Sequence, residues 1–237
     1  MDIKNKNIVV TGASDGIGRC TALKLAAAGS NLALLSRSQE KLDLLMQELS
    51  GKYPQQKFIA YPCDISQLEQ IKPTIQKIIS DFKNIHVLLN IAGIWLKMSP
   101  LEEVAPEDIQ SVIQTNLIGL IQITSQLLPN LKQQSEAIII NDSSRSGYMA
   151  QPGQSIYCAS KFGVYGFTEV LKVDLKDSGV RVAGIYQGGT NTQLFSKANE
   201  VDRPRDNFTD PNDLADTIVF MLTRPPKLWI HDIRITY

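Results

Sequence analysis

Cysteine, histidine and net charge are all scarce in this sequence, and each shortage excludes a kind of protein. The three cysteines, Cys20, Cys63 and Cys158, are an odd number without any C-x-x-C pair, which argues against a disulfide framework or a zinc site. We therefore expect no metal. Lysine and arginine balance aspartate and glutamate at 24 each, so no net field draws the chain to nucleic acid or an anionic membrane. A small-molecule partner is the better expectation.

Long apolar runs are missing as well. None approaches the ~18 residues that a membrane-spanning helix needs, and the densest run is AIII at 137–140. The first strand-like run begins at Ile8, which leaves no room for a secretory leader ahead of it. We expect a cytoplasmic protein that does not enter a membrane.

What the sequence does contain is a regular alternation of short Val-, Ile- and Leu-rich runs with longer segments of helical periodicity, typical of βαβ units. Strands are predicted at 7–11, 31–36, 57–61, 86–90, 136–142, 180–186 and 228–235, and helices at 17–28, 39–50, 66–82, 107–132, 156–177 and 211–222. Runs such as LALLS and VLLN are apolar on both faces, as parallel strands between two helical layers are. We predict a doubly wound α/β fold with a seven-stranded parallel sheet in three α/β/α layers, formed by one domain over 1–237.

Periodicity of either kind disappears between Gly188 and Pro211. A loop of this length in a compact domain is usually a lid or a mobile insertion. We expect a mobile substrate loop near 190–208, with a plain surface excursion as the alternative.

The stretch VVTGASDGIG at 9–18 fits two patterns. From Gly12 it reads G-x-S-x-G, the turn that presents a nucleophilic serine in hydrolases, but that turn needs several preceding strands, an upstream oxyanion loop and a later histidine. Only one strand precedes Ser14, and the only histidines are His86 and His231. As a glycine turn between a strand and a helix, the same stretch would let backbone N–H groups approach a pyrophosphate. The phosphate interpretation is favoured.

Four further stretches join this TGxxxGIG turn. They are CDIS at 63–66, NIAG at 90–93, YCASK at 157–161 with a serine thirteen residues before its tyrosine, and QGGTNT at 187–192. Together they resemble the short-chain dehydrogenase/reductase family over nearly the whole chain. The resemblance implies a Rossmann-type domain, a nicotinamide cofactor that carries the hydride, and a small carbonyl or alcohol substrate.

Tyr157 and Lys161 lie four residues apart on a predicted helix, so their side chains share one face. An ordinary amphipathic helix would explain that spacing, but Val164, Thr168 and Leu171 continue the same face as a buried one, where an ammonium needs a reason. A phenol with a reference pKa of ~10 becomes a useful proton donor and acceptor when a positive charge favours its phenolate. Lys161 would supply that charge and hold the nicotinamide ribose, and Tyr157 would be the general acid or base.

Two further residues complete the expected catalytic set. Side chains alternate along a strand, so only one of Ser143 and Ser144 can point into a cleft, and the family spacing selects Ser144 to orient the substrate carbonyl. Asn116 lies on a face that periodicity marks as buried, where an unbonded amide costs ~1–3 kcal/mol. In the resembling family the asparagine at this place loosens its helix and binds a water linked to the lysine. A turn serine and a purely structural amide are the plain alternatives.

The end of the second predicted strand bears on the choice of cofactor. NAD-specific sites place an acidic residue there, whereas this chain has Ser36 and Arg37, which can bind the extra phosphate of NADP. NADP(H) is therefore favoured over NAD(H). Asp15 is an opposing signal, because NADP-preferring relatives often carry a basic residue at that point.

The resemblance assigns the rest of the cofactor pocket. Asp64 and Ile65 would frame the adenine, the stretch Asn90 to Gly93 with Ala92 would line the adenosine-ribose side, and the turn from Gly188 through Thr190 to Thr192 would meet the carboxamide. The glycine turn itself would contribute Gly12, Ser14, Gly16, Ile17 and Gly18.

Some positions depart from the family pattern. Gln187 replaces the usual proline before the glycine, Ile91 replaces the second asparagine of NNAG, and HDIRITY stands where a glycine-rich tail is usual. None of these changes removes a reacting group.

These features favour an NADP(H)-dependent oxidoreductase acting on a carbonyl or secondary alcohol. A dinucleotide-binding sensor of the same fold, without turnover, is the alternative. Apolar residues surround the 156–177 helix more completely than one buried stripe requires. By analogy with the family, we expect a homodimer or homotetramer formed through helices 107–132 and 156–177. Trp95, Leu96, Met98, Tyr148, Met149 and Phe195 suggest an apolar substrate pocket.

Overall fold

The computed structural model describes residues 1–200, 206–225 and 227–236, and a parallel sheet lies at its centre. The strands are β1 (Asn7–Thr11), β2 (Asn31–Ser36), β3 (Phe58–Pro62), β4 (Val87–Asn90), β5 (Ala137–Asp142), β6 (Val180–Gln187) and β7 (Asp232–Ile235). Their order is β3-β2-β1-β4-β5-β6-β7, with every neighbouring pair parallel. The strand order reverses between β1 and β4, and doubly wound sheets bind their ligands at this switch point.

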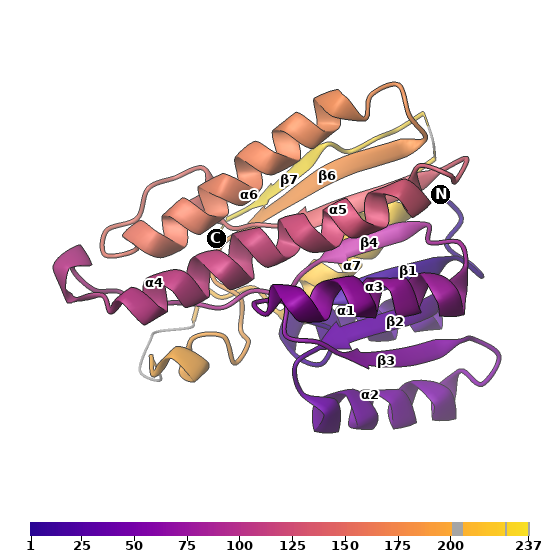
Figure 1. Cartoon of the computed structure of the whole chain (residues 1–237), viewed down its shortest axis with the longest axis horizontal. Coiled ribbons are helices and arrows are strands. Elements are labelled where there is room, and N and C mark those ends of the chain that lie inside the picture. Colours follow the sequence, from indigo (N-terminus) through magenta and orange to yellow (C-terminus); the bar gives the residue numbers. More distant parts are fainter. Residues whose placement is uncertain (201–205, 226, 237) are drawn as a thin grey trace.

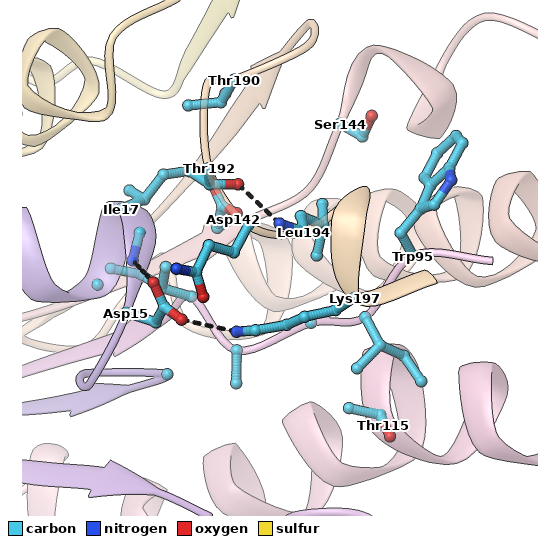
Figure 2. A pocket seen from close by; sticks show the side chains of 18 of the residues that line it. Asp15, Ile17, Trp95, Thr115, Asp142, Ser144, Thr190, Thr192, Leu194 and Lys197 are labelled. Carbon is cyan, nitrogen blue, oxygen red and sulfur yellow. Dashed lines mark hydrogen bonds and ion pairs between the residues drawn. The ribbon is translucent and has the colours of Figure 1, made fainter. Parts of the chain in front are cut away.

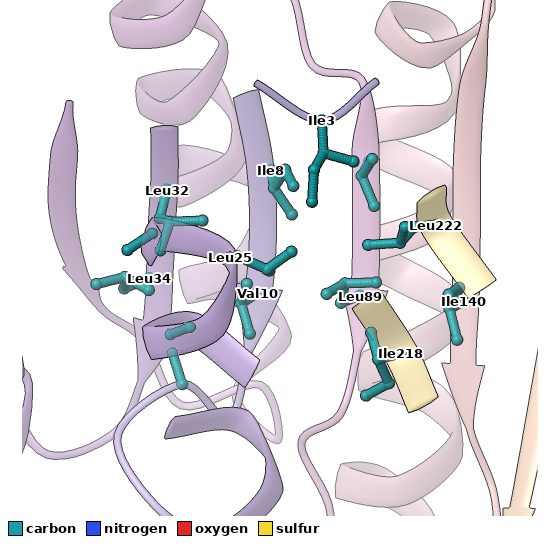
Figure 3. Packing of buried hydrophobic residues seen from close by; sticks show 14 of the residues in the cluster. Ile3, Ile8, Val10, Leu25, Leu32, Leu34, Leu89, Ile140, Ile218 and Leu222 are labelled. Carbon is teal, nitrogen blue, oxygen red and sulfur yellow. The ribbon is translucent and has the colours of Figure 1, made fainter. Parts of the chain in front are cut away.

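Helices cover both faces of the sheet, so the predicted fold class is confirmed (Figure 1). One face packs on α1 (Gly16–Ala27), α2 (Gln39–Lys52) and α7 (Pro211–Thr223), and the other on α3 (Leu68–Phe82), α5 (Leu120–Leu131) and α6 (Ser155–Asp174). Figure 3 shows the first interface, where Val10 and Leu89 of the sheet meet Leu25 of α1 and Ile218 of α7. Burial of these side chains against the sheet is the main stabilising term.

Local sequence sets where several helices begin. The Ser38 side chain accepts a hydrogen bond from the Lys41 amide at 3.2 Å and caps α2. Asp210 caps α7 in the same way, and Pro211 occupies the first turn, where its missing N–H costs nothing.

The predicted helix 107–132 is not one regular helix. It consists of α4 (Pro106–Ile113), the π-helical turn η2 (Gln114–Gly119) and α5. Gly119 allows close contact here, because a Cβ on it would lie 2.4 Å from the Ile65 carbonyl oxygen. The apolar periodicity continues through the π-turn, so sequence alone joins the three pieces.

The last strand is shorter than predicted. We expected 228–235, but pairing with β6 starts only at Asp232, opposite Gly184. Upstream of Asp232, the Trp229 ring lies against the Arg181 guanidinium at 4.7 Å. Side-chain packing thus takes the place of backbone pairing with β6 at this point.

The polar segment after β6 contains more order than its composition suggests. Thr190 and Thr209 form an isolated parallel bridge, and Ser196–Ala198 make the short 3-10 turn η4. Two similar turns, η1 (Leu101–Glu103) and η3 (Arg145–Gly147), were not predicted, because three residues are too few to show a periodicity. Part of the predicted mobile loop, 201–205, lies outside the described residues.

Candidate active site

The carboxyl ends of the strands surround a cavity of about 400 Å³ at the switch point. Its walls come from the β1–α1 turn, the ends of β2, β4, β5 and β6, the start of α6, and the segment that includes η4 (Figure 2). The predicted site residues that line it are Gly12, Ser14, Gly16, Ile17, Gly18, Ser36, Arg37, Asp64, Ile65, Ala92, Gly93, Ser144, Tyr157, Lys161, Gly188, Thr190 and Thr192. Segments far apart in sequence thus meet at one place.

The glycine turn between β1 and α1 has a backbone that requires glycine. Gly12 and Gly16 have φ of 68° and 48°, the left-handed region that side chains rarely adopt. A Cβ on Gly18 would lie 2.2 Å from the Gly12 carbonyl oxygen, so the start of α1 packs directly on the turn. Gly16, Ile17 and Gly18 at the start of α1 line this cavity, and the first N–H groups of a helix have no intrahelical partners, as an anion site requires.

Asp15 caps α1 and carries an ion pair on each side. Its carboxylate accepts from the Gly16 amide at 2.8 Å, and it pairs with Lys41 Nζ at 2.8 Å and Lys197 Nζ at 2.7 Å. Burial opposes ionisation, but the hydrogen bonds from Lys197 and Lys41 prevail and lower the pKa of Asp15 to about 2. Figure 2 shows the Lys197 side chain extended toward Asp15. The negative charge that opposed NADP in the sequence is therefore matched by two lysines.

The predicted buried face of α6 is confirmed. Tyr157 and Lys161 are 6% and 4% exposed, and Val164, Thr168 and Leu171 continue the same face into the core. Lys161 Nζ lies 5.9 Å from the centre of the Tyr157 ring and donates to the Asp142 main-chain carbonyl at 3.1 Å. Burial lowers the pKa of Lys161, and the charge of Asp142 opposes that shift.

The two serines after β5 point in different directions. Ser143 Oγ donates to the Lys161 main-chain carbonyl at 3.1 Å and so anchors α6. Ser144 Oγ accepts from the Ser146 amide at 3.1 Å, and its side chain stands beside the cavity (Figure 2). Both residues line the cavity, so the choice of Ser144, which rests on the family spacing, stays a prediction.

Asn116 lies behind the cavity wall rather than in it. Its amide accepts from the Ile94 N–H at 2.8 Å and donates to the Ile94 carbonyl at 2.9 Å and to Ser160 Oγ at 3.2 Å. It sits on η2, so the helix departs from regular α geometry at this residue. Gly93 separates it from Lys161: a Cβ there would lie 3.3 Å from Asn116 Oδ1 and 3.6 Å from Lys161 Nζ.

Asn90 does not line the cavity, which corrects its predicted place beside the adenosine ribose. Its side chain points into the protein and donates to Thr124 Oγ1 at 3.0 Å and Asn141 Oδ1 at 2.8 Å. Asn141 in turn donates to Thr168 of α6 at 2.9 Å. These buried polar side chains connect β4, β5 and two helices. The prediction grouped Asn90 with Ala92 and Gly93, which do line the cavity, because the residues are neighbours in sequence.

Aromatic rings cover the Tyr157 side of the cavity. The Trp95 ring lies 4.5 Å from that of Tyr157 and 5.0 Å from that of Phe195, edge to face in both pairs. Trp95 and Phe195 line the cavity, whereas Leu96, Met98, Tyr148 and Met149 of the expected apolar set do not. Trp95 Nε1 and the Met98 amide both donate to Glu200, which ties the segment after β6 to the loop after β4.

Sequence reasoning did not assign Asp142 to the site, although this carboxyl lines the cavity. It is 7% exposed. Burial raises its pKa to about 6, and the Lys161 charge and the Gln187 hydrogen bond limit that rise. Its position as the last residue of β5 is a signal that could have found it, since carboxyl ends of parallel strands form the site.

The pocket residues fit a dinucleotide. The glycine turn, at the N-terminus of α1, lines the cavity together with Ser36 and Arg37 and with Tyr157 and Lys161. Gln187 Oε1 and Thr190 Oγ1 are buried without a partner among the described residues, near the turn expected to meet the carboxamide. Buried polar atoms of this kind are rare and mark places where a ligand can bond.

Comparison with known proteins places the chain in a family. Residues 6–203 match the family model of the short chain dehydrogenases, and the chain belongs to this family. The 3-oxoacyl-(acyl-carrier-protein) reductase FabG of Thermotoga maritima is 32% identical over 93% of this chain and 92% of that protein. The NADP-dependent 3-hydroxy acid dehydrogenase of Schizosaccharomyces pombe is 30% identical over 97% and 92%.

Solved structures show the same fold. An alcohol dehydrogenase from the archaeon Thermococcus sibiricus, complexed with 5-hydroxy-NADP, superposes with a TM-score of 0.89 at 23% identity, covering 98% of this chain and 96% of that one. A serine dehydrogenase in its closed form, complexed with NADP⁺, has a TM-score of 0.86 at 26% identity over 96% and 93%. The chain is thus a short-chain dehydrogenase/reductase that acts on CH–OH or C=O groups. Among its described helices, none is long and apolar enough to span a membrane.

Proposed function

We propose that this protein transfers a hydride between NADP(H) and a small carbonyl or secondary alcohol, with Tyr157 as general acid and base. The observation that carries the proposal is the meeting of Ser144, Tyr157 and Lys161 in the same cavity as the glycine turn and the Ser36–Arg37 pair. A dinucleotide-binding sensor without turnover would need only the glycine turn and the Ser36–Arg37 pair.

Each side chain has a distinct part in the proposed reaction. The Ser144 hydroxyl orients and polarises the substrate carbonyl, and the Tyr157 hydroxyl donates its proton to the oxygen as negative charge develops there. The nicotinamide, when bound, supplies or accepts the hydride. The buried Lys161 ammonium favours the phenolate form of Tyr157 and holds the cofactor ribose. Asn116 keeps the loop with Ile94 and Gly93 against the lysine.

The charges around the glycine turn support NADP(H) over NAD(H). Arg37 is exposed and lines the cavity next to Ser36, and Ser36 Oγ lies 2.6 Å from Ser14 Oγ. Lys41 and Lys197 more than neutralise Asp15. The serine dehydrogenase structure with NADP⁺ and the NADP-dependent yeast relative agree with this choice.

Replacing Tyr157 by Phe tests the assignment. The ring and its packing on Trp95 remain, but the proton donor is lost, so turnover is expected to fall by about 10²–10⁴-fold while NADPH still binds. NADPH oxidation with a panel of ketones, aldehydes, ketoacyl thioesters and hydroxy-amino acids measures turnover, and fluorescence titration measures binding.

Tyr148→Phe is the matched control, because Tyr148 does not line the cavity. It should retain wild-type turnover with any substrate that the panel identifies. Unchanged turnover in Tyr157→Phe would remove that residue from the proposed chemistry.

A further inference from the structure

Asp142 and Gln187 form a polar pair where the strands β5 and β6 end. The Gln187 side chain lowers the pKa of the Asp142 carboxyl, and its carbonyl oxygen is buried without a partner within the described part of the chain. Both side chains are 7% exposed, and both line the cavity. A buried carboxyl without a full counter-ion is costly, so its presence on a cavity wall requires a reason.

This pair lies between the two groups expected to hold the nicotinamide half of the cofactor. Lys161 Nζ is hydrogen-bonded to the Asp142 main chain at 3.1 Å, and Gln187 directly precedes the turn Gly188 to Thr192. Asp142 lines the same cavity as the lysine and that turn. Figure 2 shows Asp142 between Asp15 of the glycine turn and Ser144.

The charge of the nicotinamide ring changes with its oxidation state: the oxidised ring is a cation and the reduced ring is neutral. A fixed ammonium such as Lys161 repels the cation, and a carboxylate attracts it. We propose that the Asp142 carboxylate, held by Gln187, is a residue that selects the oxidised cofactor by balancing Lys161 and the positive nicotinamide. The inference rests on the proposed function, since it requires that a nicotinamide dinucleotide binds here.

The surroundings of Asp142 identify the charges that act on it. Burial raises the pKa of the Asp142 carboxyl to about 6. Lys161 of α6 is the charged residue that acts on this carboxyl, and its charge lowers the pKa. The other charged or titratable residues on the cavity wall are Asp15, Arg37, Lys41, Cys63, Asp64, Arg145, Tyr157 and Lys197. The carboxyl is thus ionised at about pH 8 and increasingly protonated below about pH 6.

The test compares binding of NADP⁺ and NADPH by calorimetry or fluorescence, repeated with NAD⁺ and NADH, at about pH 8. Asp142→Asn keeps the shape and a hydrogen-bonding group beside Gln187 but removes the charge. The ratio of NADP⁺ to NADPH affinity is expected to fall by roughly tenfold, because one charge pair at reduced dielectric is lost. Asp64→Asn, a carboxyl on the same cavity near the expected adenine, is the control and should change both affinities equally.

A wild-type titration gives a second, independent measurement if the Asp142→Asn variant does not fold. In the wild type, the ratio of NADP⁺ to NADPH affinity should fall as the pH drops through about 6, because protonation removes the negative charge of Asp142. An unchanged or increased ratio in Asp142→Asn, with both forms bound, overturns the inference and leaves the proposed function standing. Absence of binding of any dinucleotide to the wild type overturns both.

Discussion

Arg37 illustrates how one exposed side chain can govern the choice of cofactor. It lies at the cavity edge next to Ser36, and its guanidinium can form charge-assisted hydrogen bonds with a phosphate. NAD(H) lacks the 2′-phosphate that NADP(H) carries on its adenosine ribose. Its contribution should therefore be specific to NADP(H).

Arg37→Gln is expected to weaken NADPH binding by about tenfold or more, since a hydrogen bond to a charged group contributes ~1.5–3 kcal/mol. NADH binding should change little. Fluorescence titration with both cofactors measures the effect. Arg19→Gln is the matched control, because Arg19 pairs with Glu48 and lies outside the cavity. Equal loss of both cofactors would show that Arg37 does not read the phosphate.

Single residues also show where sequence reasoning reached its limit. Tyr157, Lys161 and Ser144 line the cavity as the sequence predicts, because helix and strand periodicities fix which side chains share a face. Asn90 was predicted to line the cavity and does not, and Asp142 lines it although no prediction placed it there. Both residues stand at the ends of strands. Whether such a side chain points into the core or toward the cavity depends on neighbours that are distant in sequence, such as Thr124 and Gln187.

Among the secondary-structure elements, η2 supports the loop beside Lys161. Its Asn116 bonds to both main-chain groups of Ile94 and so fixes the loop that separates the π-turn from Lys161. The amide is 1% exposed, so these bonds have no water to replace them.

Asn116→Ala should destabilise the protein by about 2 kcal/mol, because buried main-chain groups of Ile94 lose their partner. Urea denaturation followed by fluorescence measures the change. Thr115→Ala, at the neighbouring position that lines the cavity, leaves these bonds intact and should cost less. Equal stabilities of the two variants would contradict the structural part assigned to Asn116.

The segment with η4 is held over the glycine turn by Lys197 and Asp15. This pair is partly exposed, and such pairs contribute ~0.2–1 kcal/mol. Lys197→Gln should therefore increase hydrogen exchange around residues 194–200 by no more than about fivefold, and added salt should have the same effect on the wild type.

Lys52→Gln, which removes the surface pair with Glu48 on α2, is the matched control for Lys197. Its exchange around residues 194–200 should equal that of the wild type. A Lys197 variant that exchanges no faster than this control would show that the ion pair does not hold the segment.

Considered as one molecule, the chain leaves an apolar surface uncovered on α6. Phe162, Val170 and Val173 are 43%, 58% and 66% exposed, and α6 runs along the edge of the molecule in Figure 1. We propose that a second copy covers this surface, in a homodimer or homotetramer.

Light scattering at micromolar concentration should give a dimer or tetramer, and Val173→Glu should shift it toward monomer, because a charge would be buried in the apolar contact. Leu44→Glu, at an isolated exposed leucine on α2, should leave the assembly unchanged. A wild-type monomer would contradict the proposed interface.

The sheet, its covering helices and the pairing of Tyr157 with Lys161 were all predictable from the chain itself. These features depend on local periodicity and on glycine geometry, and both are set by neighbouring residues. The seven strands were found with small errors at their ends, apart from the shorter β7.

Tertiary structure alone decided which distant residues share the cavity. The Asp15 pairs with Lys41 and Lys197 and the placing of Asp142 beside Lys161 each join segments separated by many residues, whereas the loosened helix at Asn116 was expected from the resemblance. Such contacts depend on how helices and strands pack, and a carboxyl such as that of Asp142 acquires its unusual pKa only when packing removes it from water.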